Sequence, residues 1–131
     1  AAYAAGDTFG SKGFFDVPKS GIIQTGIFYD LDDEGLAMDL VLFDGDFTNT
    51  GADNAAADFS DADLQRSIGV LSWATTDFKN FASNQIGTIK ALGFSYVAPA
   101  GRLYYQWVAQ GAVNIAAANL PKFMLLILPD A

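Results

Sequence analysis

The sequence predicts an all-β fold, an antiparallel β-sandwich of jelly-roll type with an extended N-terminal arm. Short apolar runs that alternate with a period of two recur along the chain, and turn-forming residues separate them at the spacing typical of a sandwich. The 13 glycines among 131 residues fit many tight turns. Hydrophobic residues make up 51% of the chain, enough for a core that needs no disulfide. We expect residues 1–20 to form the arm and residues 21–131 to form a single sandwich domain.

The clearest expected hairpin joins Ile22–Asp30 to Ala37–Phe43 through the acidic turn Leu31–Gly35. Both segments carry apolar residues on both faces, which is more than a sheet with one solvated face requires. About seven or eight short strands are expected in total. The others include Ile68–Trp73, Ile86–Val97, Arg102–Gln110 and Phe123–Leu128.

Helix is expected to be scarce, under about 15% of the chain, because only Ser60–Ser67 has the residues of a helix start. Ser60 can cap the first turn, and Asp61 and Asp63 favour the positive end of the helix dipole. The preceding segment Asp44–Asp58 is a long polar loop, and loops of that length are usually functional or mobile.

The expected arm contains the candidate partner-binding residues. Phe14 and Phe15 are adjacent, so in a strand they point to opposite faces, and one of them needs an apolar partner outside the core. An extended arm can also add a strand to the sheet edge of another subunit. The candidates for partner contact are Tyr3, Phe9, Phe14 and Phe15.

The residue types present argue against catalysis and against a bound cofactor or metal. The chain has no histidine and no cysteine, which excludes a Ser-His-Asp triad and thiolate metal ligands. No phosphate-binding loop or dinucleotide fingerprint occurs. An EF-hand that started at Asp30 would need a glutamate where Val41 stands, so calcium is not expected either.

A carboxylate-based hydrolase is one hypothesis for the function, since paired carboxylates can hydrolyse glycosides. Most of the acidic residues lie in predicted turns, where burial rarely tunes a pKa. Asp39 is the exception, because it falls inside a predicted strand. This hypothesis requires two buried carboxylates that converge in a cleft.

The charge distribution limits the classes of partner that we expect the chain to bind. The net charge is −8: residues 1–63 hold 13 acids and two bases (−11), and residues 64–131 hold two acids and five bases (+3). A net acidic chain with scattered bases is not expected to bind nucleic acid. The longest apolar run, Phe123–Leu128, is too short to span a membrane, and no membrane partner is expected. The chain starts at Ala1, which we interpret as methionine removal, with a cleaved propeptide as the alternative.

Four segments resemble small structural proteins encoded in the head-gene clusters of tailed bacteriophages. They are Tyr3–Asp7, Asp39–Phe43 after the acidic turn, Ser60–Asp63 and Ile68–Val70. Proteins of this kind are similar to capsid decoration, or cement, proteins. The resemblance implies a virion protein on the outer capsid surface that clamps neighbouring subunits of the major capsid protein, often as a trimer. It implies no catalytic residues.

Two further expectations follow. We expect a homo-oligomer, a trimer, because of the two-faced apolar strands, the Phe14–Phe15 pair and the charge split, which favours a head-to-tail contact. The alternative function is a receptor- or glycan-binding module of a phage fibre or a bacterial surface. That alternative requires an exposed aromatic platform formed from Trp73, Tyr104, Tyr105 and Trp107.

Overall fold

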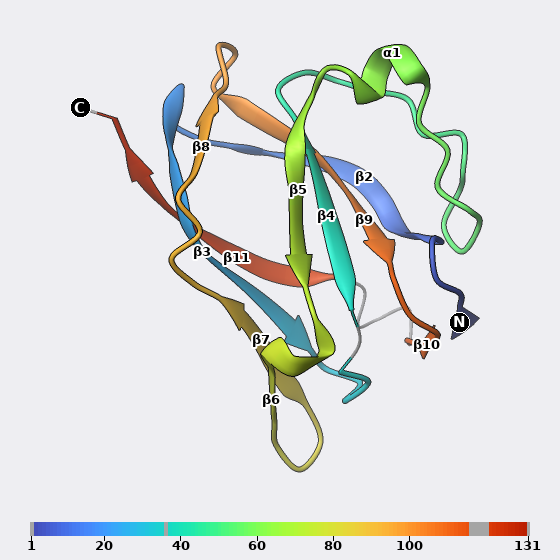
Figure 1. Cartoon of the computed structure of the whole chain (residues 1–131). Coiled ribbons are helices and arrows are strands. Elements are labelled where there is room, and N and C mark those ends of the chain that lie inside the picture. The colour runs from blue at the N-terminus through green and yellow to red at the C-terminus, as the bar shows by residue number, and fades with distance from the viewer. Residues whose placement is uncertain (1, 36, 116–120, 131) are drawn as a thin grey trace.

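The computed structural model describes residues 2–35, 37–115 and 121–130, and these form an antiparallel β-sandwich (Figure 1). The four-stranded sheet has the order β2 (Thr8–Asp16), β9 (Arg102–Ala109), β4 (Met38–Phe43), β5 (Ser67–Trp73). The five-stranded sheet has the order β11 (Lys122–Pro129), β3 (Ser20–Asp30), β7 (Gln85–Ile89), β6 (Phe78–Asn80), and β8 (Phe94–Val97) also pairs with β3. A separate short pair consists of β1 (Ala2–Tyr3) and β10 (Val113–Asn114). The predicted sandwich is confirmed, whereas the jelly-roll connectivity is not.

Helix is as scarce as predicted in the described part of the chain. It consists of the four-residue α1 (Asp61–Leu64) and the three-residue 3-10 helix η1 (Thr75–Asp77). The Ser60 side chain accepts a hydrogen bond from the Asp63 backbone N–H at 3.1 Å. The N-cap predicted for Ser60 is therefore confirmed.

The predicted hairpin between Ile22–Asp30 and Ala37–Phe43 is wrong, although both strands exist. β3 pairs with β11, β7 and β8, whereas β4 pairs with β5 and β9 in the opposite sheet. The acidic turn therefore carries the chain from one sheet to the other. Asp30 holds this turn by accepting hydrogen bonds from the backbone N–H groups of Asp32 and Gly35.

A β-bulge interrupts the strict alternation of side chains along β3. Leu126 of β11 pairs with Thr25, and the next residue, Ile127, pairs with Ile23, so Gln24 is an extra residue in β3. The bulge shifts the alternation by one position, because side-chain direction reverses at every residue of a strand. As a result Ile23 and Phe28 both point into the core.

The structure does not confirm a separate N-terminal arm for residues 1–20. Thr8–Asp16 is a strand of the four-stranded sheet, paired with β9. The segment before it is held by backbone hydrogen bonds, including Gly6 N–H to Ala109 O at 2.6 Å and Ala109 N–H to Asp7 O at 2.9 Å. This position is explained by Tyr3 and Phe9, because their aromatic side chains fill the core.

The core lies between the two sheets and is rich in aromatic side chains. Trp107 packs against Trp73 and Phe28, with ring centroids 5.2 Å and 5.0 Å away. Trp73 donates its indole N–H to Gly87 O at 3.0 Å. This packing joins β9 and β5 of one sheet to β3 and β7 of the other and fixes how the sheets face each other.

A second, smaller core covers the outer face of the four-stranded sheet. Phe47, from the loop of residues 44–60, stacks on Phe43 with ring centroids 4.0 Å apart. Val41 and Val108 belong to the same cluster. The chain's own loop therefore covers the outer apolar residues of β4. The apolar residues on both faces of β4 were one reason to expect a trimer. Packing within a single chain accounts for them.

Candidate protein-binding surface

The outer face of the five-stranded sheet exposes apolar side chains from four of its strands, with serines and threonines between some of them. Strand register decides which side chains these are, because directly paired residues in antiparallel strands share a face. The pairs Met124–Ile27, Leu128–Ile22 and Tyr29–Ile86 all lie on the side away from the core. We call this set the apolar face: Ile22, Ile27, Tyr29, Ile86, Val97, Met124, Leu126 and Leu128.

The apolar face is most exposed along β11. Met124, Leu126 and Leu128 have 47%, 48% and 55% of their surface exposed. On the far side of β3, Val97 of β8 is 62% exposed. Single exposed apolar residues are common, but a contiguous set across neighbouring strands marks a protein-interaction surface.

Charged residues border the apolar face. Lys122 and Asp130 lie at the two ends of β11, and Lys79 pairs with Ile86 at the β6 edge. An apolar centre with a charged rim is the usual arrangement of a protein–protein interface. The apolar face therefore has the composition of a docking site for another protein.

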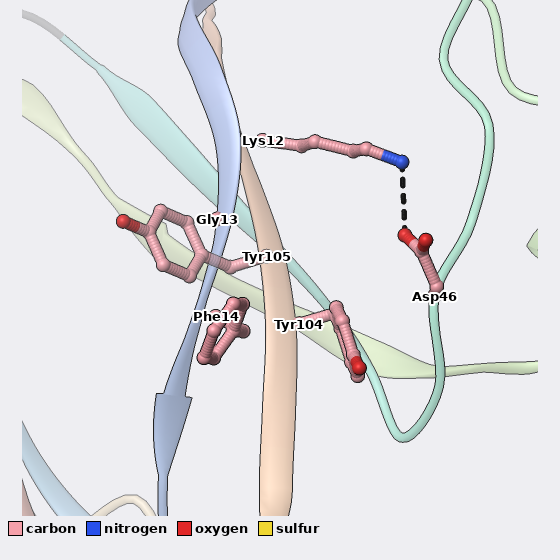
Figure 2. A pocket seen from close by; sticks show the side chains of 6 residues that line it. All are labelled: Lys12, Gly13, Phe14, Asp46, Tyr104 and Tyr105. Atoms are coloured by element: carbon pink, nitrogen blue, oxygen red, sulfur yellow. Dashed lines mark hydrogen bonds and ion pairs between the residues drawn. The ribbon is translucent and has the colours of Figure 1, made fainter.

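A second feature is a pocket of about 600 Å³ on the outer side of the four-stranded sheet. Figure 2 shows Phe14 and Tyr104 beside one another, with Lys12 reaching across to Asp46 in the loop of residues 44–60. The Phe14 and Tyr104 rings have centroids 5.7 Å apart. The Arg102 guanidinium lies 4.1 Å from the Phe14 ring centroid.

The Lys12–Asp46 ion pair closes one side of this pocket. Lys12 Nζ donates to Asp46 Oδ1 at 2.8 Å and to Phe47 O at 2.7 Å. The hydrogen bond from Lys12, and then that from the Phe47 N–H, lower the pKa of the Asp46 carboxyl. Asp46 therefore stays ionised and fixes the position of the lysine.

The structure separates the four residues predicted for partner contact. Tyr3 and Phe9 are 4% and 0% exposed, so neither side chain is accessible to a partner. They were expected on a free arm, but their rings pack together in the core, with centroids 4.9 Å apart. Phe14 is 54% exposed, and Phe15 is half-buried against Phe123. Phe14 and Phe15 point to opposite faces as predicted, and their role in partner binding stays a prediction.

The aromatic platform required by the glycan-binding alternative does not form from the four residues named for it. Trp73 and Trp107 are buried in the core. Tyr104 pairs with Phe14 on the outer face, whereas Tyr105 points inward, where burial raises its pKa. The exposed aromatic pair is instead Phe14 with Tyr104.

The described residues include one buried carboxylate, Asp30, which is occupied by the turn that it holds. Asp39 lies on the outer face of β4, half-buried, and accepts a hydrogen bond from Gln110 Nε2 at 3.0 Å. Within the described ranges, no three acidic side chains come together as a set of metal ligands. The convergent carboxylates that the hydrolase hypothesis requires are not found in this part of the chain.

The exposure of β11 could not be predicted from its composition. Phe123–Leu128 is uniformly apolar, so no alternation distinguishes a buried face from an exposed one. A usable signal was the pair of flanking prolines, Pro121 and Pro129, because proline is confined to edge strands and strand ends. That signal identifies an edge strand but not an exposed face.

Comparison with protein-family models, with curated proteins and with solved structures finds no significant match to this chain. None of the helices in the described residues has the length and apolar character needed to cross a lipid bilayer. The geometry of the surface therefore carries the functional argument.

Proposed function

We propose that this chain is a structural virion protein that binds the outer face of a phage capsid and clamps neighbouring subunits of the major capsid protein. The observation that carries the proposal is the apolar face, which joins side chains from β11, β3, β7 and β8 into one exposed surface. Burial of such a surface contributes about 25 cal/mol per Å² before the costs of association. A protein that stays attached to a shell needs an apolar contact area of this kind.

The other half of the molecule supports the same role. The loop of residues 44–60 packs on the four-stranded sheet and covers the outer apolar residues of β4. Eleven of the 15 acidic residues lie in residues 30–63, and the loop and α1 carry several of them. One side of the sandwich is thus apolar and the opposite side is acidic, as expected of a protein with one attached side and one solvated side.

The test is whether the chain sediments with particles. Phage particles from cultures of the organism that carries this gene are separated on a density gradient, and an antibody against the chain follows it through the fractions. We expect the chain in the fraction of filled heads, and gold-labelled antibody on the outside of the heads. Recovery of the chain only among free proteins would overturn the proposal.

One observation favours the alternative, a receptor- or glycan-binding module. The pocket of about 600 Å³ combines an exposed aromatic pair with a fixed ion pair, and sugars bind to such surfaces by stacking and hydrogen bonding. Binding to a glycan array that Phe14→Ala abolishes and Phe81→Ala leaves unchanged would support this function. Phe81 is a matched control because it is equally exposed, but in the turn between β6 and β7.

The expected homotrimer stays a prediction, and fewer observations now support it. The loop of residues 44–60 covers the outer residues of β4, and Tyr3 and Phe9 lie in the core. The charge split and the exposed Phe14 remain as reasons for association. Any self-association therefore has to use a surface that is exposed in the single chain.

A further inference from the structure

The outer edge of β11 is open: no strand in the described part of the chain pairs with it. β11 forms one edge of the five-stranded sheet and pairs with β3 on its other side. An edge strand of this length presents unpaired backbone N–H and C=O groups to another chain. The side chains next to this edge on the outer face are apolar and exposed, namely Met124, Leu126 and Leu128.

The hydrogen bonds to β3 decide which backbone groups are free. Asp130 N–H donates to Ser20 O at 3.2 Å, so the even-numbered residues of β11 direct their backbone groups toward β3. The bulge is on the β3 side, so the alternation along β11 is unbroken. Phe123, Leu125 and Ile127 therefore direct their backbone groups outward.

The sequence of β11 is complementary to itself when it is read antiparallel about Leu126. In that register Lys122 lies opposite Asp130 of the second copy, Met124 lies opposite Leu128, and Leu126 lies opposite Leu126. The two charges at the ends are opposite in sign, and neither Lys122 nor Asp130 forms an ion pair elsewhere in the described residues. A shift of the centre to Leu125 would place Lys122 opposite Leu128, and a shift to Ile127 would place Asp130 opposite Met124.

We propose that β11 pairs with β11 of a second copy of this chain, antiparallel and centred on Leu126. The outward backbone groups of Leu125 and Ile127 then bond to those of the other copy, and Phe123 N–H bonds to the Pro129 carbonyl. This gives about six backbone hydrogen bonds across the two-fold axis. Pro129 lacks an N–H group, so no donor is lost at that position.

The pairing joins two five-stranded sheets into one continuous sheet and doubles the apolar face. A two-fold contact closes at two copies, so the inference predicts a dimer in place of the trimer expected from the sequence. The proposal does not rest on capsid attachment. If the chain does attach to a shell, a doubled apolar face is wide enough to contact two neighbouring subunits.

The first test is a disulfide cross-link at the axis. The chain has no cysteine, so Leu126→Cys introduces one thiol per copy. Opposed Cα atoms in a non-hydrogen-bonded antiparallel pair lie about 4.5 Å apart, within disulfide range. We expect mild oxidation to convert Leu126→Cys to a covalent dimer. Met124→Cys is the control, because its counterpart lies four positions away, about 13 Å. Absence of the Leu126→Cys cross-link, or an equal cross-link from Met124→Cys, overturns the proposed pairing.

The second test uses charge reversal and sedimentation velocity. Lys122→Asp places two like charges together at each end, and we expect the dimer dissociation constant to rise about tenfold or more. The double variant Lys122→Asp with Asp130→Lys restores opposite charges and should restore the dimer. Lys90→Asp makes the same change beyond β7, separated from β11 by β3, and should have no effect. A wild-type chain that is monomeric at 100 micromolar, or a double variant no better than the single one, contradicts the proposal.

Discussion

Gly26 lies on the core side of β3, where the absence of a side chain makes room for Trp73. A Cβ atom at this position would lie 2.7 Å from Trp73 Cζ2 and 3.2 Å from Ile89 Cγ1. Both neighbours are buried and held by further contacts, so they have little space to move. Gly26→Ala should therefore lower the free energy of unfolding by about 1–3 kcal/mol, measured by urea titration.

Gly45→Ala is the control for this change. No atom lies within 4 Å of a Cβ at Gly45, and its backbone is outside the left-handed region. Its unfolding free energy should stay within about 0.5 kcal/mol of the wild type. Equal stability of the two variants would show that Trp73 does not occupy the space beside Gly26.

Tyr3 gives the molecule a defined response to alkaline pH. Burial, followed by its hydrogen bond to Asp53, raises the pKa of Tyr3 from 10.0 to about 12. The folded chain holds a proton that the unfolded chain releases near pH 10, so this contribution to stability is complete below pH 10 and is lost as the pH rises to about 12.

Tyr3→Phe should make the fall in stability between pH 10 and 12 shallower, because phenylalanine has no proton to lose. At neutral pH the variant should lose about 1 kcal/mol with the hydrogen bond. Urea titrations at several pH values measure both effects. A Tyr3→Phe variant whose stability falls as steeply as that of the wild type would mean that Tyr3 is not buried in this way.

At the scale of elements, the loop of residues 44–60 works as part of the core. Phe47 is buried by Phe43 and Phe59, and Asn49 fixes the loop by accepting hydrogen bonds from the Gly51 and Asp58 N–H groups at 3.0 Å and 2.8 Å. Phe47→Ala should lower the free energy of unfolding by about 3 kcal/mol and expose the outer residues of β4.

Phe81→Ala is the control for Phe47→Ala, because it removes the same side chain from an exposed position in the turn after β6. It should alter the unfolding free energy by no more than about 0.5 kcal/mol. Thermal and urea unfolding measure both variants. If both variants unfold alike, the loop of residues 44–60 does not pack on the sheet as described.

The sequence predicts the elements of this fold better than their pairing. Ser60 and the strands near residues 68–73, 102–109 and 123–128 follow from local patterns, because capping and alternation act over a few residues. The hairpin prediction for β3 and β4 failed because an acidic turn between two apolar strands suits a link between sheets as well as a hairpin. The Gln24 bulge and the coverage of β4 by Phe47 depend on distant contacts that a local pattern does not contain.

At the scale of the whole molecule, the two sheets differ in what covers their outer faces. On the four-stranded sheet the chain's own loop covers the outer residues of β4, whereas the apolar face of the five-stranded sheet is open. The sequence predicted contacts through apolar strand faces and an N-terminal arm. In the structure Tyr3 and Phe9 lie in the core, and the apolar side chains that stay exposed on the five-stranded sheet belong to β11 and its neighbours.

Val97 provides the most direct test of the proposal that the apolar face attaches the chain to a capsid. It is well exposed, and β3 separates its strand from β11, so Val97→Asp should fold normally. Val70→Asp is the matched change, because Val70 has similar exposure on β5 of the other sheet.

The measurement is the occupancy of particles stripped of this protein and then titrated with each purified variant. Wild type and Val70→Asp should saturate the particles at the same concentration, and Val97→Asp should need at least about tenfold more, because it places a charge in an apolar contact. Equal occupancy by Val97→Asp and Val70→Asp would contradict the account.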